Sequence, residues 1–417
     1  MTTVAVTLGA ILVILLLSFR RSPQAAFMDR SSTDALRGLA ALGVVIHHIY
    51  YWVAQTPDAF PILSLTGQMG VAIFLGLSGY GLQVSYQKRR LERHIQGRPI
   101  HFSSAVLLSL TLVYSVGAII KGLPTGAVPL LLTAYFVTFG RNREPLLTDY
   151  LVSRLARLYV LVVLVGAFTI AGLAISGAQT PSTYSVVIAL TGRDVWFVQY
   201  LVTWYVAFAL SWVLPERMRV SAMFVWAIAW SVAMARVGWG YPAEYAIAFP
   251  TGCLLANLIA RPDRERAVHF GALAGLAAAA VALAVLVTKP DLATTARTML
   301  LGGLGTPTSV GTVDWPWLPL ARLLPSVVVV LAACGLSLLA ARARVRSPLL
   351  EFMGRCALAM YLLNLGLLVH FDPVMYRGPL VVTQWLAIAL LITLAAAFTA
   401  ADTRIRSWLI RRIPRAA

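Results

Sequence analysis

An arginine and a histidine stand eleven residues apart in one apolar stretch, Asp34 to Trp52, which reads DALRGLAALGVVIHHIYYW. On an α-helix this spacing gives about 1100° of rotation and roughly 16 Å of rise, so Arg37 and His48 lie on nearly the same face while His47 points away. If Arg37 lies at a membrane surface, His48 lies near the middle of the roughly 30 Å hydrocarbon layer. An imidazole there can take a proton from a hydroxyl, and a guanidinium can hold an anionic substrate group.

Both residues also have a structural interpretation. Arg37 can simply mark a cytoplasmic loop, and His48 can hydrogen-bond to a neighbouring helix. Asp34 lies near the same face, where it can pair with Arg37 or occupy the first helical turn, in which the helix dipole favours an acid. The spacing alone leaves these alternatives open.

Basic residues gather at a second place along the chain. Arg154 and Arg157 share one helix face, and the neighbouring loop carries Lys88, Arg89 and Arg90. A mouth of this kind can hold the phosphates of a polyanionic donor. Arginines that only fix the topology of a membrane protein are the equally good alternative.

Several other polar residues lie in apolar runs. Ser78 stands in GLSGYG, whose small residues favour close helix packing more than nucleophilic chemistry. Trp196 and Gln199 belong to a polar stripe on the next conspicuous run, which predicts a cavity-lining or helix-bonding face. Tyr361 and Asn364 share a face at positions i and i+3, and either orient a substrate or bond another helix.

The composition indicates a polytopic integral membrane protein. The 417 residues are 59% hydrophobic and 12% charged, with a mean hydropathy of +0.80. The net charge of +18 comes from short basic clusters between apolar runs, which is the positive-inside pattern and excludes nucleic acid as a partner. Cys253, Cys334 and Cys356 lie singly in apolar segments, so neither a disulfide framework nor a metal site is expected.

The apolar runs predict an all-α bundle in the lipid bilayer. An N-terminal helix occupies residues 1–21 with its N-terminus outside, the main membrane domain spans 30–410, and a basic tail, 402–417, lies in the cytoplasm. Residues 102–140 form an added hairpin whose second arm is short. Thirteen spans place nearly every basic cluster on one side. The expected spans are 3–19, 34–52, 68–86, 102–120, 127–140, 157–175, 196–214, 220–236, 243–259, 270–287, 322–340, 350–370 and 380–400.

Taken in order, five motifs resemble the membrane-bound acyltransferase 3 family. DALRGLAALGVVIHH resembles its first core segment, with Arg37 and His48 as the spaced pair, FLGLSGYG its second, and SRLARLYVLVV its arginine-pair segment. WFVQYLVTWYVAFALSWVLP is similar to its Trp, Tyr and Pro segment, carried by Trp196, Tyr205 and Pro215. GRCALAMYLLNLGLL resembles the segment that ends in Tyr-Leu-x-His, although Asn364 stands where the family usually has histidine.

The resemblance implies about ten core helices, here extended by the N-terminal helix and the hairpin to about 11–13 spans. It also implies transfer of an acyl group, most often acetyl, from acyl-CoA to a hydroxyl of a glycan, glycolipid or other small acceptor in the plasma membrane. Arg37, Arg154 and Arg157 then hold the donor's phosphates, with Arg89 and Arg90 at the same mouth. His48 acts as general base on the acceptor or helps to move the acyl group inward.

Two other functions remain open. A transporter or flippase binds a glycolipid without modifying it, but such proteins often have inverted repeats and midplane carboxylates, and here Glu244 is the nearest candidate acid. A family member that has lost its transferase activity is the second alternative, because Asn364 cannot carry out the proton transfer of a histidine.

Overall fold

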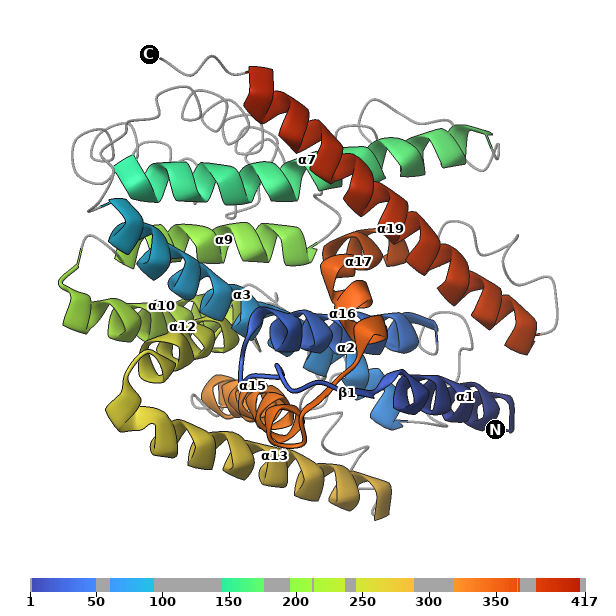
Figure 1. Ribbon diagram of the computed structural model, residues 1–417, viewed down its shortest axis with the longest axis horizontal. Coiled ribbons are helices and arrows are strands. Elements are labelled where there is room, and N and C mark those ends of the chain that lie inside the picture. Colours follow the sequence, from blue (N-terminus) through green and yellow to red (C-terminus); the bar gives the residue numbers. More distant parts are fainter. Residues whose placement is uncertain are drawn as a thin grey trace. The chain divides into compact units, whose positions relative to one another are not determined.

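The structure, a computed structural model, is built almost entirely from α-helices (Figure 1). It describes residues 2–49, 61–93, 145–175, 196–211, 214–236, 245–288, 318–365, 367 and 380–412. The helices in these ranges are α1 (Thr2–Ser18), α2 (Arg30–His48), α3 (Pro61–Arg93), α7 (Pro145–Ile175), α9 (Trp196–Ser211), α10 (Glu216–Arg236), α12 (Ala248–Ile259), α13 (Glu265–Thr288), α15 (Leu318–Arg342), α16 (Pro348–Arg355), α17 (Ala357–Leu365) and α19 (Leu380–Arg412). A short 3-10 helix, η4 (Pro262–Arg264), precedes α13, and two strands, β1 (Arg20–Arg21) and β2 (Val345–Arg346), complete the described elements.

The chain forms two compact units. The first unit contains Met1–Gly81 and Ala227–Thr399, and the second contains Leu82–Trp226 and Ala400–Ala417. The predicted helical fold is confirmed. Within the described ranges, four segments are long and apolar enough to cross a membrane: Leu65–Lys88, Pro262–Val285, Leu323–Arg342 and Val382–Trp408.

Helix α2 lies inside the first unit because glycines let two neighbouring helices approach it. A Cβ on Gly38 would collide with the carbonyl of Leu350 in α16, and a Cβ on Gly354 would collide with the backbone of Asp34. On its other side, α2 packs against α3, where a Cβ on Gly70 would overlap Ala40. Ten residues of the 19-residue helix are buried, which fits its position among neighbours.

Helices α2 and α3 run antiparallel. Thr66, at the start of α3, donates a hydrogen bond of 2.9 Å to the carbonyl of Gly43, near the end of α2. Towards the other end of α3, Tyr80 bonds to the carbonyl of Met28, just before α2 begins. Two consecutive membrane helices, one running outward and the next returning, are expected to be antiparallel in this way.

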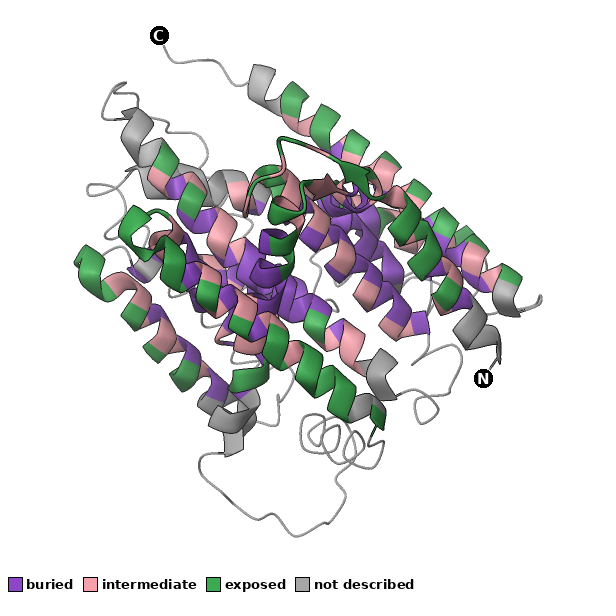
Figure 2. Cartoon of the chain, turned by 60° about the horizontal axis from the view of Figure 1, so that its bottom comes forward, coloured by how far each residue is buried: buried purple, intermediate pink, exposed green. Residues whose placement is uncertain are grey.

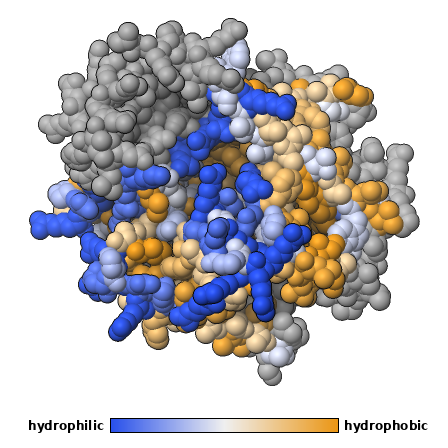
Figure 3. Space-filling view, in the orientation of Figure 1, coloured by the Kyte–Doolittle hydropathy of each residue, from blue (hydrophilic) through white to orange (hydrophobic). Residues whose placement is uncertain are grey.

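Three basic clusters of the first unit meet near the start of α2. They are the arginines of β1, those at and just before β2, and those just before His269 at the start of α13. Strands β1 and β2 pair antiparallel, which joins Arg20 to Arg346, and the ring of Phe27 contacts His269 at the start of α13 in a T-shaped arrangement with ring centroids 5.2 Å apart. Figure 3 shows the hydrophilic side chains gathered over this end. The predicted topology requires these clusters to share one side, and the strand pairing agrees with it, although the strands themselves were not expected.

Helix α13 contributes a narrow buried stripe and an exposed apolar face. Val268 and Ala272 are buried, whereas Phe270 and Val281 are 77% and 64% exposed. The contrast between purple interior residues and green outer faces is visible in Figure 2. An exposed face this rich in apolar side chains is typical of a helix that contacts lipid or another protein.

Several helix boundaries differ from those expected. The single helix expected over 350–370 is wrong, because the helix is interrupted at Cys356. The backbone of Cys356 (φ −97°, ψ 1°) ends α16, and α17 begins at the next residue. Helix α7 begins at Pro145, twelve residues before the expected start, and α19 continues from the expected end at 400 to Arg412. Polar and charged residues at both places were taken as loop, but leucine, alanine and arginine, which favour helix, stand among them and the helices continue. The hairpin at 102–140 lies outside the described residues.

Candidate active site

His48 meets Asn364 inside the first unit. His48 is the last residue of α2 and is half-buried, and its Nδ1 lies 2.5 Å from the side-chain nitrogen of Asn364 on α17. Asn364 is 0% exposed, and its side-chain oxygen has no hydrogen-bond partner among the residues that the structure describes. The contact joins two segments 316 positions apart and places the amide where it can control the imidazole.

His47 faces a different helix, as the helical phase predicts. A Cβ on Gly67 of α3 would lie 2.6 Å from the Cγ of His47, so the glycine provides the space that this ring occupies. The two imidazole rings are 5.2 Å apart with their planes tilted by 57°. The neighbouring histidines therefore have different surroundings: His47 packs against Gly67, and His48 contacts Asn364.

Arg37 and Asp34 form an ion pair on α2. Arg37 donates a hydrogen bond of 2.7 Å to the carboxylate of Asp34, whose side chain is 12% exposed, and Arg30 lies 3.9 Å from the same carboxylate. The guanidinium also lies close to α3, since a Cβ on Gly81 would be 3.5 Å from it. The alternative in which Asp34 pairs with Arg37 is the one that the structure contains. The Arg37 side chain as a whole is 30% exposed.

Asp29 closes the amino-terminal end of α2. Its carboxylate accepts hydrogen bonds from the Ser32 amide at 2.7 Å, from the Ser31 hydroxyl and from Arg346 at 2.9 Å. Burial raises the pKa of Asp29, but the bonds from Ser32 and Ser31 and the charge of Arg346 outweigh it and hold the pKa below 3.8. Sequence reasoning missed the contact with Arg346, because the two residues are 317 positions apart in the chain.

Ser78 lies among glycines that pack helices together. A Cβ on Gly79 would collide with the Phe249 carbonyl of α12, and a Cβ on Gly252 would collide with Gly76. Cys253 donates a weak hydrogen bond of 3.4 Å to the Gly79 carbonyl. The close packing predicted for GLSGYG is confirmed. Ser78 itself is half-buried.

Tyr361 and Asn364 occupy one side of α17, as predicted, and contact different helices. The Tyr361 ring meets Phe74 of α3 edge to face, with centroids 6.4 Å apart, whereas Asn364 meets His48 of α2. Both residues therefore join α17 to a neighbouring helix, and Asn364 is the one that contacts the candidate catalytic residue, His48.

Apart from Arg37, the predicted phosphate-binding residues belong to the second unit. Arg154 on α7 donates a hydrogen bond of 3.0 Å to Ser85 on α3, and Arg157 is exposed one turn later. Lys88 is exposed three residues after Ser85, so at least three cations belong to this neighbourhood. Arg89 and Arg90 belong to α3, but their side chains lie outside the described residues.

Helix α9, also in the second unit, begins at Trp196, the first residue of the predicted polar stripe. Tyr205 is half-buried on this helix. The side chains of Trp196 and Gln199 are outside the described residues, so the stripe stays a prediction.

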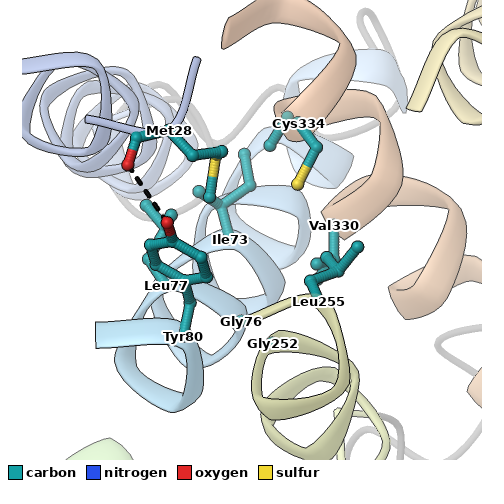
Figure 4. A pocket seen from close by; sticks show the side chains of 10 residues that line it. Met28, Ile73, Gly76, Leu77, Tyr80, Gly252, Leu255, Val330 and Cys334 are labelled. Carbon is teal, nitrogen blue, oxygen red and sulfur yellow. Dashed lines mark hydrogen bonds between the residues drawn. The ribbon is translucent and has the colours of Figure 1, made fainter. Parts of the chain in front are cut away.

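A small apolar pocket in the first unit was not predicted (Figure 4). Its lining comes from the turn before α2 and from α3, α12 and α15: Met28, Ile73, Gly76, Leu77, Tyr80, Gly252, Leu255, Val330, Ala333 and Cys334. Tyr80 lies along one side, with its hydroxyl bonded to the Met28 carbonyl at 3.2 Å. No sequence pattern joins these four segments, and only the GLSGYG motif pointed to one of them.

Comparison of the chain with models of protein families, with curated proteins and with solved structures finds no match. The resemblance to the membrane-bound acyltransferase 3 family therefore stays a prediction that rests on the five motifs and their order.

Proposed function

We propose that this protein is an integral membrane O-acyltransferase that moves an acyl group, most often acetyl, from acyl-CoA to a hydroxyl of a glycan, glycolipid or other small acceptor. The contact between His48 and Asn364 supports this proposal most directly. It joins His48, in the first of the five family-like motifs, to Asn364, in the last of them, although the two residues are 316 positions apart.

In the proposed reaction, His48 acts as general base on the acceptor hydroxyl. An imidazole is suited to this role because its neutral form can accept a proton near neutral pH. Arg37, whose side chain is 30% exposed, binds an anionic group of a substrate, and Asp34 fixes the orientation of its guanidinium. Arg154 and Arg157 contribute to recognition of the phosphates of acyl-CoA, with Arg89 and Arg90 completing the cationic neighbourhood.

The proposed protein crosses the cytoplasmic membrane many times, with about ten core helices, an added N-terminal helix and an added hairpin. Its N-terminus lies outside and its C-terminus in the cytoplasm. Four apolar helices of sufficient length support this arrangement, as does the meeting of three basic clusters at one end of the first unit.

The experiment is a transfer assay with purified protein, radiolabelled acetyl-CoA and a lipid and glycan extract of the source cells. Mass spectrometry of the same extract from a deletion strain identifies the acceptor, because the missing product differs by one acyl group. We expect label in an extractable glycan or lipid and release of free CoA. Substrate flux across vesicles without any acyl donor, and no transfer, would favour a transporter. Neither transfer nor flux would favour an inactive family member.

A further inference from the structure

The contact between His48 and Asn364 restricts the proton on the imidazole. An amide nitrogen carries only donor hydrogens, so where the Asn364 nitrogen faces Nδ1, that ring nitrogen must offer a lone pair. A neutral imidazole then carries its single proton on Nε2. In this state the ring donates at Nε2 and has no lone pair there.

The proposed reaction needs the opposite state. Asn364 covers Nδ1, so the acceptor hydroxyl can reach only Nε2, and a general base needs its lone pair on that atom. After the proton arrives, the imidazolium carries a hydrogen on Nδ1 as well, which needs an acceptor next to it. The amide nitrogen cannot be that acceptor.

The other end of the same amide can be that acceptor. The Asn364 oxygen is buried and has no hydrogen-bond partner within the described ranges, so the contact with Nδ1 is the one described hydrogen bond of this amide, and either end of the amide can make it. Half a turn of the amide group exchanges its oxygen and nitrogen, which are similar in size, and brings the oxygen to Nδ1 without moving the ring.

We propose that Asn364 is a positioning residue that sets which nitrogen of His48 carries the proton, and that its oxygen faces Nδ1 during acyl transfer. This inference rests on the proposed function. With the oxygen at Nδ1, the ring holds its proton there and offers the Nε2 lone pair to the acceptor.

The step then balances. The acceptor oxygen attacks the thioester carbonyl carbon while its proton moves to Nε2, and the resulting imidazolium keeps its Nδ1 hydrogen on the amide oxygen. The carbon–sulfur bond breaks, and the Nε2 proton passes to the leaving thiolate. The products are the acyl ester and free CoA thiol, and His48 returns to its starting state.

Three variants test the assignment kinetically. Asn364→Leu removes both amide atoms at similar volume, and we expect kcat to fall on the order of 10²-fold or more with KM for acyl-CoA nearly unchanged. Asn364→Asp supplies a carboxylate that accepts from Nδ1, so we expect it to keep kcat within about tenfold of the parent protein. Gln384→Leu is the matched control, because it removes another buried amide of the same unit, whose oxygen accepts a hydrogen bond from Thr7 and whose nitrogen has no partner among the described residues.

A spectroscopic measurement separates positioning from simple packing. The chain has six histidines, so nitrogen NMR of protein labelled only in histidine is tractable, and His48→Ala identifies the His48 signals. We expect the parent and Asn364→Asp proteins each to show one protonation pattern of the ring, the latter with the proton on Nδ1. Asn364→Leu should show a mixture, while Gln384→Leu should match the parent.

Full kcat in folded Asn364→Leu, equal losses in Asn364→Leu and Asn364→Asp, or identical ring spectra in all variants would overturn the assignment. The spectra do not depend on activity. A parent protein with the expected spectra but no acyl transfer would contradict the proposed function, and full transfer in His48→Ala would contradict the role of His48 as general base. Both results would leave the control of the ring by Asn364 intact.

Discussion

Arg346 reaches Asp29 with a hydrogen bond of 2.9 Å and thereby joins the end of β2 to the first turn of α2. The two side chains are 27% and 25% exposed, so the pair is partly shielded from solvent. Because Asp29 also caps α2 through the Ser32 amide, this contact fixes the helix that carries Arg37 and His48 to the strand pair at its base.

The depressed pKa of Asp29 predicts a dependence of stability on pH. A carboxyl group with a folded pKa below its unfolded value near 3.8 stabilises the protein above that unfolded value and loses this contribution as the pH falls through the folded pKa. Asn is also a good helix cap, so Asp29→Asn removes the charge and keeps the cap. We expect it to lower stability by about 1 kcal/mol at pH 7 and by less at pH 3.

The measurement is the thermal midpoint in detergent at both pH values. Asp263→Asn is the control, because Asp263 pairs with Arg264 at the surface, where both side chains are more than half exposed. Equal losses for Asp29→Asn at the two pH values would contradict the role of the charge.

The close approach of α2 and α16 predicts that a single methyl group is costly. A Cβ on Gly354 would overlap the backbone of Asp34, so Gly354→Ala must push the helices apart, at about 1–3 kcal/mol. Gly271→Ala on α13 is the matched control, since a Cβ there meets nothing within 4 Å and alanine favours the helix. The measurement is the thermal midpoint of each variant compared with that of the parent protein. A Gly354→Ala protein as stable as the Gly271→Ala protein would show that the helices are not so close.

The partly buried ion pair between Arg37 and Asp34 predicts coupled effects. Arg37→Gln leaves a carboxylate with 12% side-chain exposure and a more distant cation, Arg30, so we expect it to destabilise more than the double variant with Asp34→Asn. A double-mutant cycle on thermal stability should give a coupling of about 1 kcal/mol or more. Additive losses would mean that the pair contributes little. In the transfer assay, Arg37→Gln should lower activity and Arg37→Lys should recover part of it.

The helical fold and the different surroundings of His47 and His48 were predictable because both depend on local patterns. Apolar runs determine the helices, and a rotation of 100° per residue separates His47 from His48. The partner of His48 was not predictable, because the break at Cys356 sets the position of α17 and leaves no periodic signal. Asn364 was read as a departure that weakens catalysis, whereas the structure places it on the imidazole.

The other features that could not be predicted depend on contacts between segments that are far apart in the sequence. The pairing of β1 with β2 involves two residues from each strand, which is too short for alternation to show in sequence. Gln384 on α19 accepts a hydrogen bond from Thr7 on α1, and an isolated threonine and glutamine in two apolar runs carry no indication of a shared contact. Arg154, in contrast, was singled out from its spacing with Arg157, but its bond to Ser85 required the fold.

The cations of the second unit predict a charge-dependent donor affinity. We expect Arg154→Gln and Arg157→Gln each to raise the KM for acyl-CoA about tenfold, the loss of one charge-assisted hydrogen bond of about 1.5 kcal/mol. Ser85→Ala is the control for Arg154, since it removes the hydrogen bond between them and keeps the charge. Initial rates across a range of acyl-CoA concentrations give the values. An unchanged KM in both arginine variants would contradict their assignment to the donor.

The most direct measurement of the central claim compares His48→Ala with His47→Ala in the transfer assay. Both substitutions remove an imidazole from the end of α2, but only the first removes the ring beside Asn364. The account predicts a loss on the order of 10²- to 10⁴-fold in kcat for His48→Ala and a kcat within a few-fold of the parent for folded His47→Ala. Full acyl transfer by a folded His48→Ala protein would contradict it.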